Sequence, residues 1–420
     1  MKVLVVGSGA REHTITWKLA QSKKIDKLYA APGNAGMKAI AETVDIKAED
    51  TGGMLKFAKE NRIDVTFIGP EQPLAAGIVD LFKKNGMAVF GPTQKAAEIE
   101  SSKVFSGMLV AKHGIPSARS ASFTDFDRAS AYLLEQTPPV VIKADGLAAG
   151  KGVIIAETHK DAMNALMDIM QNKSFGKSGD SVVFQEYLRG REMSYFVFTD
   201  GKTVLPTVPA CDYKRIFDDN KGPNTGGMGS YSPPEFYTPL LGEIILKTIM
   251  QPTILAMGDE GRPFQGTLYG GLFITPARTP KIIEFNARLG DPETQVVLPR
   301  MKTDLLDVVM AILENRLDKI NIEFDDDAAV GVVMASGGYP GSYTTGFPIK
   351  GLKDVDKDIM VFHAGTKPGP NGEVLTNGGR VLTVVAKGKT MKEAREKVYK
   401  NISRISFEGA YYRKDIANFG

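Results

Sequence analysis

Residues 139–156 read PVVIKADGLAAGKGVIIA, two short apolar runs on either side of a glycine-rich loop. Apolar runs of this length, bounded by turn residues, are typical of buried strands, so we expect a hairpin here. The loop differs from a P-loop, because only three residues separate Gly146 from Gly150. In addition, Gly152 replaces the required Ser or Thr, and a strand follows in place of a helix.

Two lysines accompany this loop. Lys143 ends the first apolar run and Lys151 lies within the loop itself. A flexible glycine hairpin can fold over the phosphates of a nucleotide, with both lysines supplying positive charge. The alternative is a glycine turn with solvated lysines. We favour the nucleotide interpretation because a lysine that ends a buried strand needs an anionic partner.

The chain before the hairpin alternates strands and helices. Strand-like runs end in glycine or Gly-Pro turns in VLVVGSGA, KLYAAPGNAG, IDVTFIGPEQP and AVFGPT. This alternation predicts a parallel α/β sheet with ligand-facing loops at the carboxyl ends of its strands. We place this N-terminal α/β domain at residues 1–101.

The first of these loops, GSGARE, begins at Gly7 and opens a helix. Its backbone N–H groups can therefore receive an anion. It is a poor dinucleotide fingerprint, because Glu12 stands at the third glycine position and no acidic residue ends the second strand. A single phosphate fits better than a pyrophosphate. A strand-to-helix turn without a ligand is an equally good interpretation of this loop alone.

A third run, IIEFNARLGDPETQ, carries polar side chains on a strand. Alternation places Glu284, Asn286 and Arg288 on one face, with Ile283 and Phe285 on the other. Two oxygen donors beside a guanidinium suit a hard cation that bridges phosphates, and Mg²⁺ needs only one or two protein carboxylates. The alternative is an edge strand with a solvated polar face.

Two weaker motifs lie between the hairpin and that strand. The loop GPNTGGMG at residues 222–229 allows close backbone approach to a small ligand, although a surface loop is the better interpretation of it alone. The strand QEYL at residues 185–188 could present backbone groups to an adenine edge, with Glu192 accepting from ribose hydroxyls. Without context, a generic strand is favoured there.

Composition excludes several classes of protein. The 420 residues carry a net charge of only +3, which argues against a nucleic-acid scaffold. One cysteine, Cys211, excludes an internal disulfide, and four histidines disfavour a His-rich metal site. No stretch approaches the roughly 20 apolar residues that span a bilayer. We therefore expect a cytoplasmic protein that binds neither membrane nor nucleic acid, and the 44 glycines point to ligand-approach loops.

Taken in order, these motifs resemble the ATP-grasp superfamily and, within it, the phosphoribosylamine–glycine ligase family. The resemblance covers essentially the whole chain and rests most firmly on KADGLAAGKGV together with GPNTGGMG. It implies an α/β protein of ATP-grasp fold, with an N-terminal parallel α/β domain and a small C-terminal α+β domain. We expect the ATP-grasp region at 102–322, with a small lid subdomain at about 118–190, and the C-terminal domain at 323–420.

The resemblance also implies a reaction. ATP, glycine and 5-phosphoribosylamine would give ADP, phosphate and glycinamide ribonucleotide, a step of purine biosynthesis, through a glycyl phosphate intermediate. Mg²⁺, with Mn²⁺ as a possible substitute, would accompany ATP. The protein would bring three anions together and neutralise charge in the transition state. We favour a monomer.

The roles that the resemblance implies fall on four groups of residues. The catalytic residues would be Lys143 and Arg288. The residues for ATP would be Lys103, Lys143, Gly146, Gly150, Lys151, Gly152, Glu186, Leu188 and Glu192. The substrate residues would be Gly7, Gly9, Arg11, Asn34, Asp212, Asn224, Gly226, Gly227 and Arg288. The metal ligands would be Glu284 and Asn286. The chain departs from the family at Ala10 and at Gln185, where many members carry Gly and Glu.

Three other functions stay open from the sequence. Another ATP-grasp ligase would join a different carboxylate to a different amine. A nucleotide-binding oxidoreductase is disfavoured by the missing ribose carboxylate. A catalytically inactive nucleotide-binding module is disfavoured because Lys143, Glu284, Asn286 and Arg288 are all present.

Overall fold

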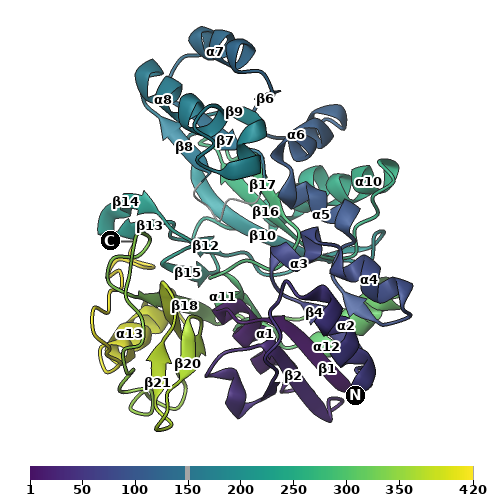
Figure 1. Ribbon diagram of the computed structural model, residues 1–420, viewed down its shortest axis with the longest axis vertical. Coiled ribbons are helices and arrows are strands. Elements are labelled where there is room, and N and C mark those ends of the chain that lie inside the picture. The colour runs from purple at the N-terminus through teal and green to yellow at the C-terminus, as the bar shows by residue number, and fades with distance from the viewer. Residues whose placement is uncertain (147–151, 420) are drawn as a thin grey trace.

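A computed structural model describes residues 1–146 and 152–419. Within these residues the strands form four sheets of four or five strands and two small two-stranded ribbons. Figure 1 shows the N-terminal sheet and the C-terminal sheet side by side at one end of the molecule, and a small antiparallel sheet with its helices projecting at the other end. The central sheet lies between them.

The N-terminal sheet is parallel, as the alternation of strands and helices predicts, with strand order β3-β2-β1-β4-β5. The apolar run after Met1 forms the central strand because both of its faces are buried. Register pairs Gly7 with Pro32 and Val6 with Ile68, so the loops after β1, β2 and β4 lie at one edge. The strands are β1 (Lys2–Gly7), β2 (Lys27–Pro32), β3 (Glu42–Thr43), β4 (Val65–Ile68) and β5 (Val89–Phe90). The helices of this region are α1 (Ala10–Leu19), α2 (Thr51–Glu60), α3 (Glu71–Ala75), α4 (Ile78–Lys84), α5 (Gln94–Ser101) and α6 (Lys103–Lys112).

The glycine-rich hairpin belongs to the small antiparallel sheet, whose strand order is β6-β9-β7-β8. Two amphipathic helices cover one face and close a hydrophobic core of its own. The strands are β6 (Ser120–Phe123), β7 (Val140–Ala144), β8 (Val153–Ala156) and β9 (Val182–Glu186), and the helices are α7 (Phe126–Glu135) and α8 (His159–Met170). The predicted residues Gly150 and Lys151 lie outside the described residues.

The central sheet is antiparallel, with strand order β11-β10-β16-β17. Its two long strands are apolar along most of their length and buried on both faces. The strands are β10 (Arg191–Thr199), β11 (Val204–Pro206), β16 (Gly266–Ile274) and β17 (Pro280–Asn286). The accompanying helices are α9 (Pro239–Ile245) and α10 (Gln251–Asp259).

The C-terminal sheet combines strands from distant parts of the chain, in the order β12-β15-β18-β22-β19. Two of them precede residue 235, so the central part of the chain contributes directly to this sheet. The strands are β12 (Cys211–Asp212), β15 (Gly229–Ser232), β18 (Ala328–Ala335), β19 (Met360–His363) and β22 (Arg380–Gly388). The helices nearby are α11 (Thr294–Val297), α12 (Leu305–Leu313) and α13 (Met391–Ile402), and the small ribbons are β13 (Arg215–Phe217) with β14 (Lys221–Asn224) and β20 (Thr366–Pro368) with β21 (Val374–Thr376).

One apolar stretch departs from the sequence expectation. Among the described residues, Pro239–Asp259 alone is long and apolar enough to cross a bilayer by length and composition. Its inner side is part of the hydrophobic core, because Ile245, Ile249 and Ile254 have no exposed surface. On its outer side, Lys247 pairs with the carboxylate one turn earlier. The stretch is therefore a core helix of this fold.

Candidate active site

One pocket collects predicted residues from four elements. Its polar lining side chains include Lys103, Lys143, Gln185, Glu284 and Asn286, which come from α6, β7, β9 and β17. These elements span nearly two hundred residues of sequence. The pocket therefore depends on how the small antiparallel sheet stands over the edge of the central sheet (Figure 1).

The two lysines are held in place by backbone carbonyls. Lys143 is buried at the end of β7, and its Nζ donates to the carbonyl of Ile283 at 3.1 Å. Lys103 begins α6, and its Nζ donates to the carbonyl of Gly146 at 2.8 Å. The carboxylate of Asp145 accepts from the backbone N–H of Lys103 at 2.6 Å. Burial lowers the pKa of Lys143 to about 8, partly offset by the nearby carboxylate of β17.

The strand β17 carries a bulge that sequence alternation did not predict. Gly271 pairs with Glu284, whereas the next residue of β16 pairs with Ile282, so Ile283 is the extra residue. Our prediction that Ile283 would share the apolar face with Phe285 was therefore wrong, since Ile282 takes that place in the core. The bulge leaves the carbonyl of Ile283 free of the ladder and available to Lys143 and to the Gln185 side chain, at 3.4 Å from the latter.

Lys214 is a site residue that sequence reasoning missed. Its Nζ lies 2.9 and 3.0 Å from the two carboxylate oxygens of Asp212 and 3.6 Å from a carboxylate oxygen of Glu192. Burial alone would raise the pKa of Glu284, but Lys214 and the two pocket lysines lower it, so this carboxyl is ionised. Alternation offered a signal, because residues 212 and 214 fall on the same face of an extended strand.

A second missed residue is the buried carboxyl of Glu293. Burial, together with the charge of Asp212, raises the pKa of Glu293 to about 7. The hydroxyl of Ser194 donates to it at 2.8 Å and lies 3.2 Å from the hydroxyl of Tyr269. The end of β10 thus brings a polar cluster against the loop that follows β17.

Arg288 lies between two carboxylates. Its Nε donates to Glu71 at 3.2 Å and its Nη2 lies 2.9 Å from Glu100. Arg11 reaches the same carboxylate of Glu71 at 3.8 Å. Although burial alone would lower it, these carboxylates raise the pKa of Arg288, which keeps the guanidinium charged. The loops after β1 and β4 are therefore linked by charge to the loop after β17.

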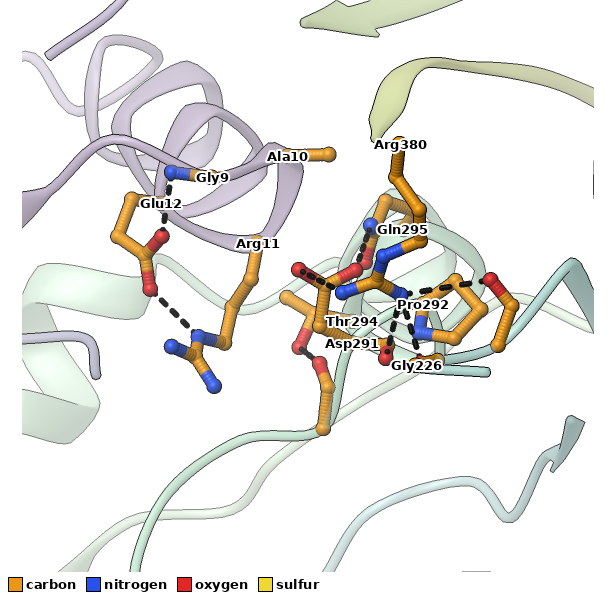
Figure 2. A network of polar contacts seen from close by, with 12 residues as sticks. Gly9, Ala10, Arg11, Glu12, Gly226, Asp291, Pro292, Thr294, Gln295 and Arg380 are labelled. Atoms are coloured by element: carbon orange, nitrogen blue, oxygen red, sulfur yellow. Dashed lines mark hydrogen bonds and ion pairs between the residues drawn. The ribbon is translucent and has the colours of Figure 1, made fainter. Parts of the chain in front are cut away.

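In the first glycine loop, the contacts of Glu12 explain why the sequence departs from a dinucleotide fingerprint. Glu12 accepts from the backbone N–H of Gly9 at 2.8 Å and lies 2.5 Å from Nε of Arg11 (Figure 2). A Cβ on Gly7, whose φ is +126°, would lie 2.4 Å from the Cγ of Glu12, so this position excludes a side chain. The amide of Asn34 fastens the loop by donating to the carbonyl of Ser8 at 2.9 Å.

The same amide of Asn34 donates to the carbonyl of His363 at 2.7 Å, which ties the N-terminal sheet to the C-terminal one. The backbone N–H of His363 in turn donates to Nδ1 of His13 at 2.8 Å. Burial lowers the pKa of both histidines, to about 3 for His13 and about 4 for His363. Both are therefore neutral hydrogen-bonding groups at an interface between sheets.

Arg380, at the start of β22, connects two loops and was also missed. Its Nη1 donates to the carbonyls of Gly226 at 2.7 Å and Asp291 at 3.0 Å, and its Nη2 lies 3.2 Å from the Asp291 carboxylate (Figure 2). Gly227 adopts a φ of +111° against Pro292. The predicted Asn224 ends β14, just before this loop. Only the tertiary fold brings Arg380 here, so no local sequence pattern could have found it.

The remaining predicted residues, Glu186, Leu188 and Gly152, do not line the pocket. Glu186 ends β9 and accepts from the backbone N–H of Arg119 at 3.2 Å, with Lys281 at 3.7 Å. Leu188 follows it and is buried. The carbonyl of Gly152 accepts from the backbone N–H at the end of β7 at 2.9 Å, which closes the hairpin at its base.

Comparison with known proteins matches nearly the whole chain. Models of phosphoribosylglycinamide synthetase match its N domain at residues 1–100, its ATP-grasp (A) domain at 101–294 and its C domain at 329–419. The chain is 50% identical over 419 residues to the phosphoribosylamine–glycine ligase of Halalkalibacterium halodurans, covering 100% of this chain and 97% of that one. It is 49% identical over 418 residues to that of Caldanaerobacter subterraneus, covering 99% of each.

Solved structures agree on the fold. The phosphoribosylamine–glycine ligase of Thermotoga maritima superposes with a TM-score of 0.87 at 32% identity, over 99% of this chain and 100% of that one. The biotin carboxylase domain of Hydrogenobacter thermophilus 2-oxoglutarate carboxylase, solved with MgADP and bicarbonate, gives 0.75 at 15% identity, over 98% and 91%. The latter likeness concerns the fold alone. The expected ATP-grasp fold is thereby confirmed.

Proposed function

The chain belongs to the phosphoribosylamine–glycine ligase family of ATP-grasp enzymes, and from this premise we propose how its site works. It joins glycine to 5-phosphoribosylamine with cleavage of ATP to ADP and phosphate, giving glycinamide ribonucleotide in purine biosynthesis. The observation that carries this proposal is the convergence of two lysines, two carboxylates and two amides on one pocket. Phosphoryl transfer needs such positioned charges more than covalent chemistry.

The nucleotide occupies this pocket in our proposal. Lys103 and Lys143 bind the phosphates of ATP, and Gly146 and Gly152 contact them in our proposal. The backbone of Glu186 to Leu188 receives the adenine, and Glu192 accepts from the ribose. The buried position of Lys143 supports this role, because a lysine with a lowered pKa gains an anionic partner when a phosphate arrives.

The residues present fit a hard divalent cation, Mg²⁺ with Mn²⁺ as a substitute. Glu284 is ionised and lines the pocket. The Nδ2 of Asn286 donates to the carbonyl of Phe285 at 2.9 Å, so its amide oxygen, which can only accept, is the atom that would ligate a cation. One carboxylate and one amide oxygen match the few protein ligands that Mg²⁺ takes when phosphates complete its shell. When bound, the cation neutralises charge on the phosphates.

Acyl transfer takes place beside Arg288. An oxygen of the glycine carboxylate attacks the γ-phosphorus of ATP, the bond to the ADP oxygen breaks, and glycyl phosphate forms. The amine nitrogen of phosphoribosylamine then attacks the acyl carbon, phosphate leaves, and the nitrogen loses a proton. Arg288 neutralises the acyl phosphate. Asp212 and the loop from Asn224 to Gly229 receive glycine and the ribose.

The ribose phosphate is received at the edge of the N-terminal sheet. The loop from Gly7 to Arg11, with Asn34, supplies this side in our proposal. Because Glu12 already accepts from the N–H of Gly9, we assign the cationic contact to Arg11. Residues 1–101 thus carry the phosphoribosylamine side, 102–322 the nucleotide with a lid at about 118–190, and 323–420 the C-terminal closure.

The decisive experiment measures ADP release by the purified full-length chain with each substrate omitted in turn. We expect release only when ATP, glycine, phosphoribosylamine and Mg²⁺ are all present, and mass spectrometry of the product identifies glycinamide ribonucleotide. ADP release that is unchanged when glycine is omitted would overturn the assigned substrate. Replacement of glycine by alanine or aspartate tests other ATP-grasp ligations directly.

We further propose that the enzyme acts in the cytoplasm as a monomer. The residues that line the pocket all come from one chain. Light scattering on the purified protein at micromolar concentration measures its mass. A mass near 45.5 kDa is expected, and a mass of twice that value would contradict the proposal.

A further inference from the structure

Glu100 is a buried carboxylate that no step proposed above uses. It lies in α5, has 7% of its surface exposed, and borders the nucleotide pocket. An unpaired carboxylate at such a depth is costly, so its partners indicate what it is for.

Both oxygens of this carboxylate contact the segment that follows β17. Its Oε1 lies 2.9 Å from Nη2 of Arg288, and its Oε2 accepts from the backbone N–H of Ala287 at 2.7 Å. The two contacts fall on adjacent residues, one on the side chain and one on the main chain. Together they fix both where the guanidinium lies and how the chain leaves the strand that carries Glu284 and Asn286.

A second carboxylate also fixes the position of the Arg288 guanidinium. Glu71 contacts the Nε edge of Arg288, so the guanidinium is gripped on two edges by residues from two helices. Lys103 begins the next helix after α5, and the charge of Glu100 helps to keep its ammonium protonated against burial. Glu100 therefore interacts with both Lys103, proposed to bind the nucleotide, and Arg288, proposed to neutralise the acyl phosphate.

We propose that Glu100 is a positioning residue for acyl transfer, which holds the Arg288 guanidinium and the end of β17 in register with the nucleotide phosphates. It touches no substrate and acts through Arg288, so the inference rests on the role proposed above for that arginine. Misplacement of a reacting group by about 1 Å can cost on the order of 100-fold in rate, which sets the size of the expected effect.

The test compares variants at one position of α5 with a matched control. Glu100→Gln keeps an oxygen that can accept from Ala287 but loses the charge that holds Arg288. Glu100→Asp keeps the charge and shortens its reach. Glu98→Gln is the control, because Glu98 lies on the same helix, is only half-buried, and pairs with Arg262, which does not line the pocket. Turnover is divided by the concentration of ATP-binding sites measured by titration, so unfolded protein is not counted.

We expect kcat to fall about 10- to 100-fold in both Glu100 variants, with KM for ATP within about threefold of the parent. The control should match the parent. In a double-mutant cycle, adding Glu100→Gln to Arg288→Lys should lower kcat by less than about a further threefold. Both substitutions disrupt the same contact between Glu100 and Arg288, so their effects should not multiply. Parent-like kcat in Glu100→Gln and Glu100→Asp, or losses that multiply in the cycle, would overturn the inference.

A purely structural role gives a different pattern. It would raise KM for ATP together with the loss of kcat, and the loss would follow the melting temperature of each variant; that result would also overturn the inference. Failure of the proposed function is separate, because the parent would then lack glycine-dependent turnover. Failure of the Arg288 role alone would appear as parent-like kcat in Arg288→Lys.

Discussion

At the residue scale, Glu284 is the pocket residue on which the proposed metal site depends most. Three lysines lower its pKa, and it is one of two predicted oxygen ligands. We expect Glu284→Ala to reduce kcat/KM for ATP by more than about 100-fold. Loss of a group that only supports a metal ligand costs up to about 100-fold, and Glu284 is itself a proposed ligand. The melting temperature should stay close to that of the parent. Steady-state ADP release measures the loss. Glu243→Gln, at an exposed helical ion pair, is the control. Parent-like turnover of Glu284→Ala would disprove the metal assignment.

Lys143 gives a prediction for pH. Its pKa is lowered to about 8, so the free enzyme loses this positive charge as the pH rises through 8. Phosphate binding favours the charged form, and ATP should therefore bind more weakly as the pH rises, by about tenfold per unit above 8. Calorimetric titration between pH 7 and 9.5 measures the dissociation constant. Lys143→Arg stays protonated and should remove the slope. A parent whose affinity is constant over this range would refute the assignment.

Residues also differ in how far the sequence could locate them. The pattern of the hairpin indicated Lys143, because a lysine at the end of a buried strand needs a partner. Lys103 followed only from the family resemblance, since nothing in its own helix indicates a ligand. Lys214 had a signal in its spacing from Asp212, whereas Arg380 had none, because its contacts depend on the pairing of strands far apart in sequence.

At the scale of elements, the bulge between β16 and β17 sets the position of the metal ligands. A Cβ on Gly271 would lie 2.9 Å from the Cγ of Glu284, closer than such atoms come in proteins. We expect Gly271→Ala to displace that carboxylate and to lower kcat/KM for ATP by about tenfold, without removing any chemical group. Gly258→Ala in α10 is the control, because nothing lies within 4 Å of its Cβ, and it should raise stability by about 0.5–1 kcal/mol.

The outcome that would count against this view is parent-like turnover in Gly271→Ala. The bulge also marks a limit of sequence reasoning about elements. Strand positions were predictable from apolar runs, as at β1 and β7. The face of the strand on which Ile283 lies was not predictable. One extra residue in a ladder reverses the alternation beyond it and leaves no trace in the local sequence pattern.

At the scale of the whole molecule, Arg380 joins three parts of the chain. It reaches from the C-terminal sheet to the carbonyl of Gly226 and to Asp291 after the central sheet. Arg380→Met would remove these hydrogen bonds, of which the one to Gly226 is exposed and the one to Asp291 is part-buried, and we expect a loss of about 0.5–1.5 kcal/mol in the free energy of unfolding. KM for phosphoribosylamine should rise at least about tenfold.

Urea unfolding and substrate titration of the same preparation measure both effects. Lys389→Ala is the matched control, because this exposed lysine follows the same strand and pairs with Asp327 at the surface. A variant at Arg380 that unfolds and binds phosphoribosylamine as the parent does would show that the two loops keep their places without the C-terminal sheet.

The composition of the C-terminal sheet has a consequence for how the chain is made. Strands β12 and β15 leave the ribosome early, but their partner β18 is itself held between β15 and β22. Since β15 ends at Ser232 and β22 begins at Arg380, translation at 5–20 residues per second separates them by roughly 7 to 30 s. Once β17 is complete at Asn286, and until β22 is made, the nascent chain carries an unpaired strand edge together with the residues that line the nucleotide pocket. A ribosome that stalls in this interval would leave a chain that can receive ATP but has an open edge for association with other chains.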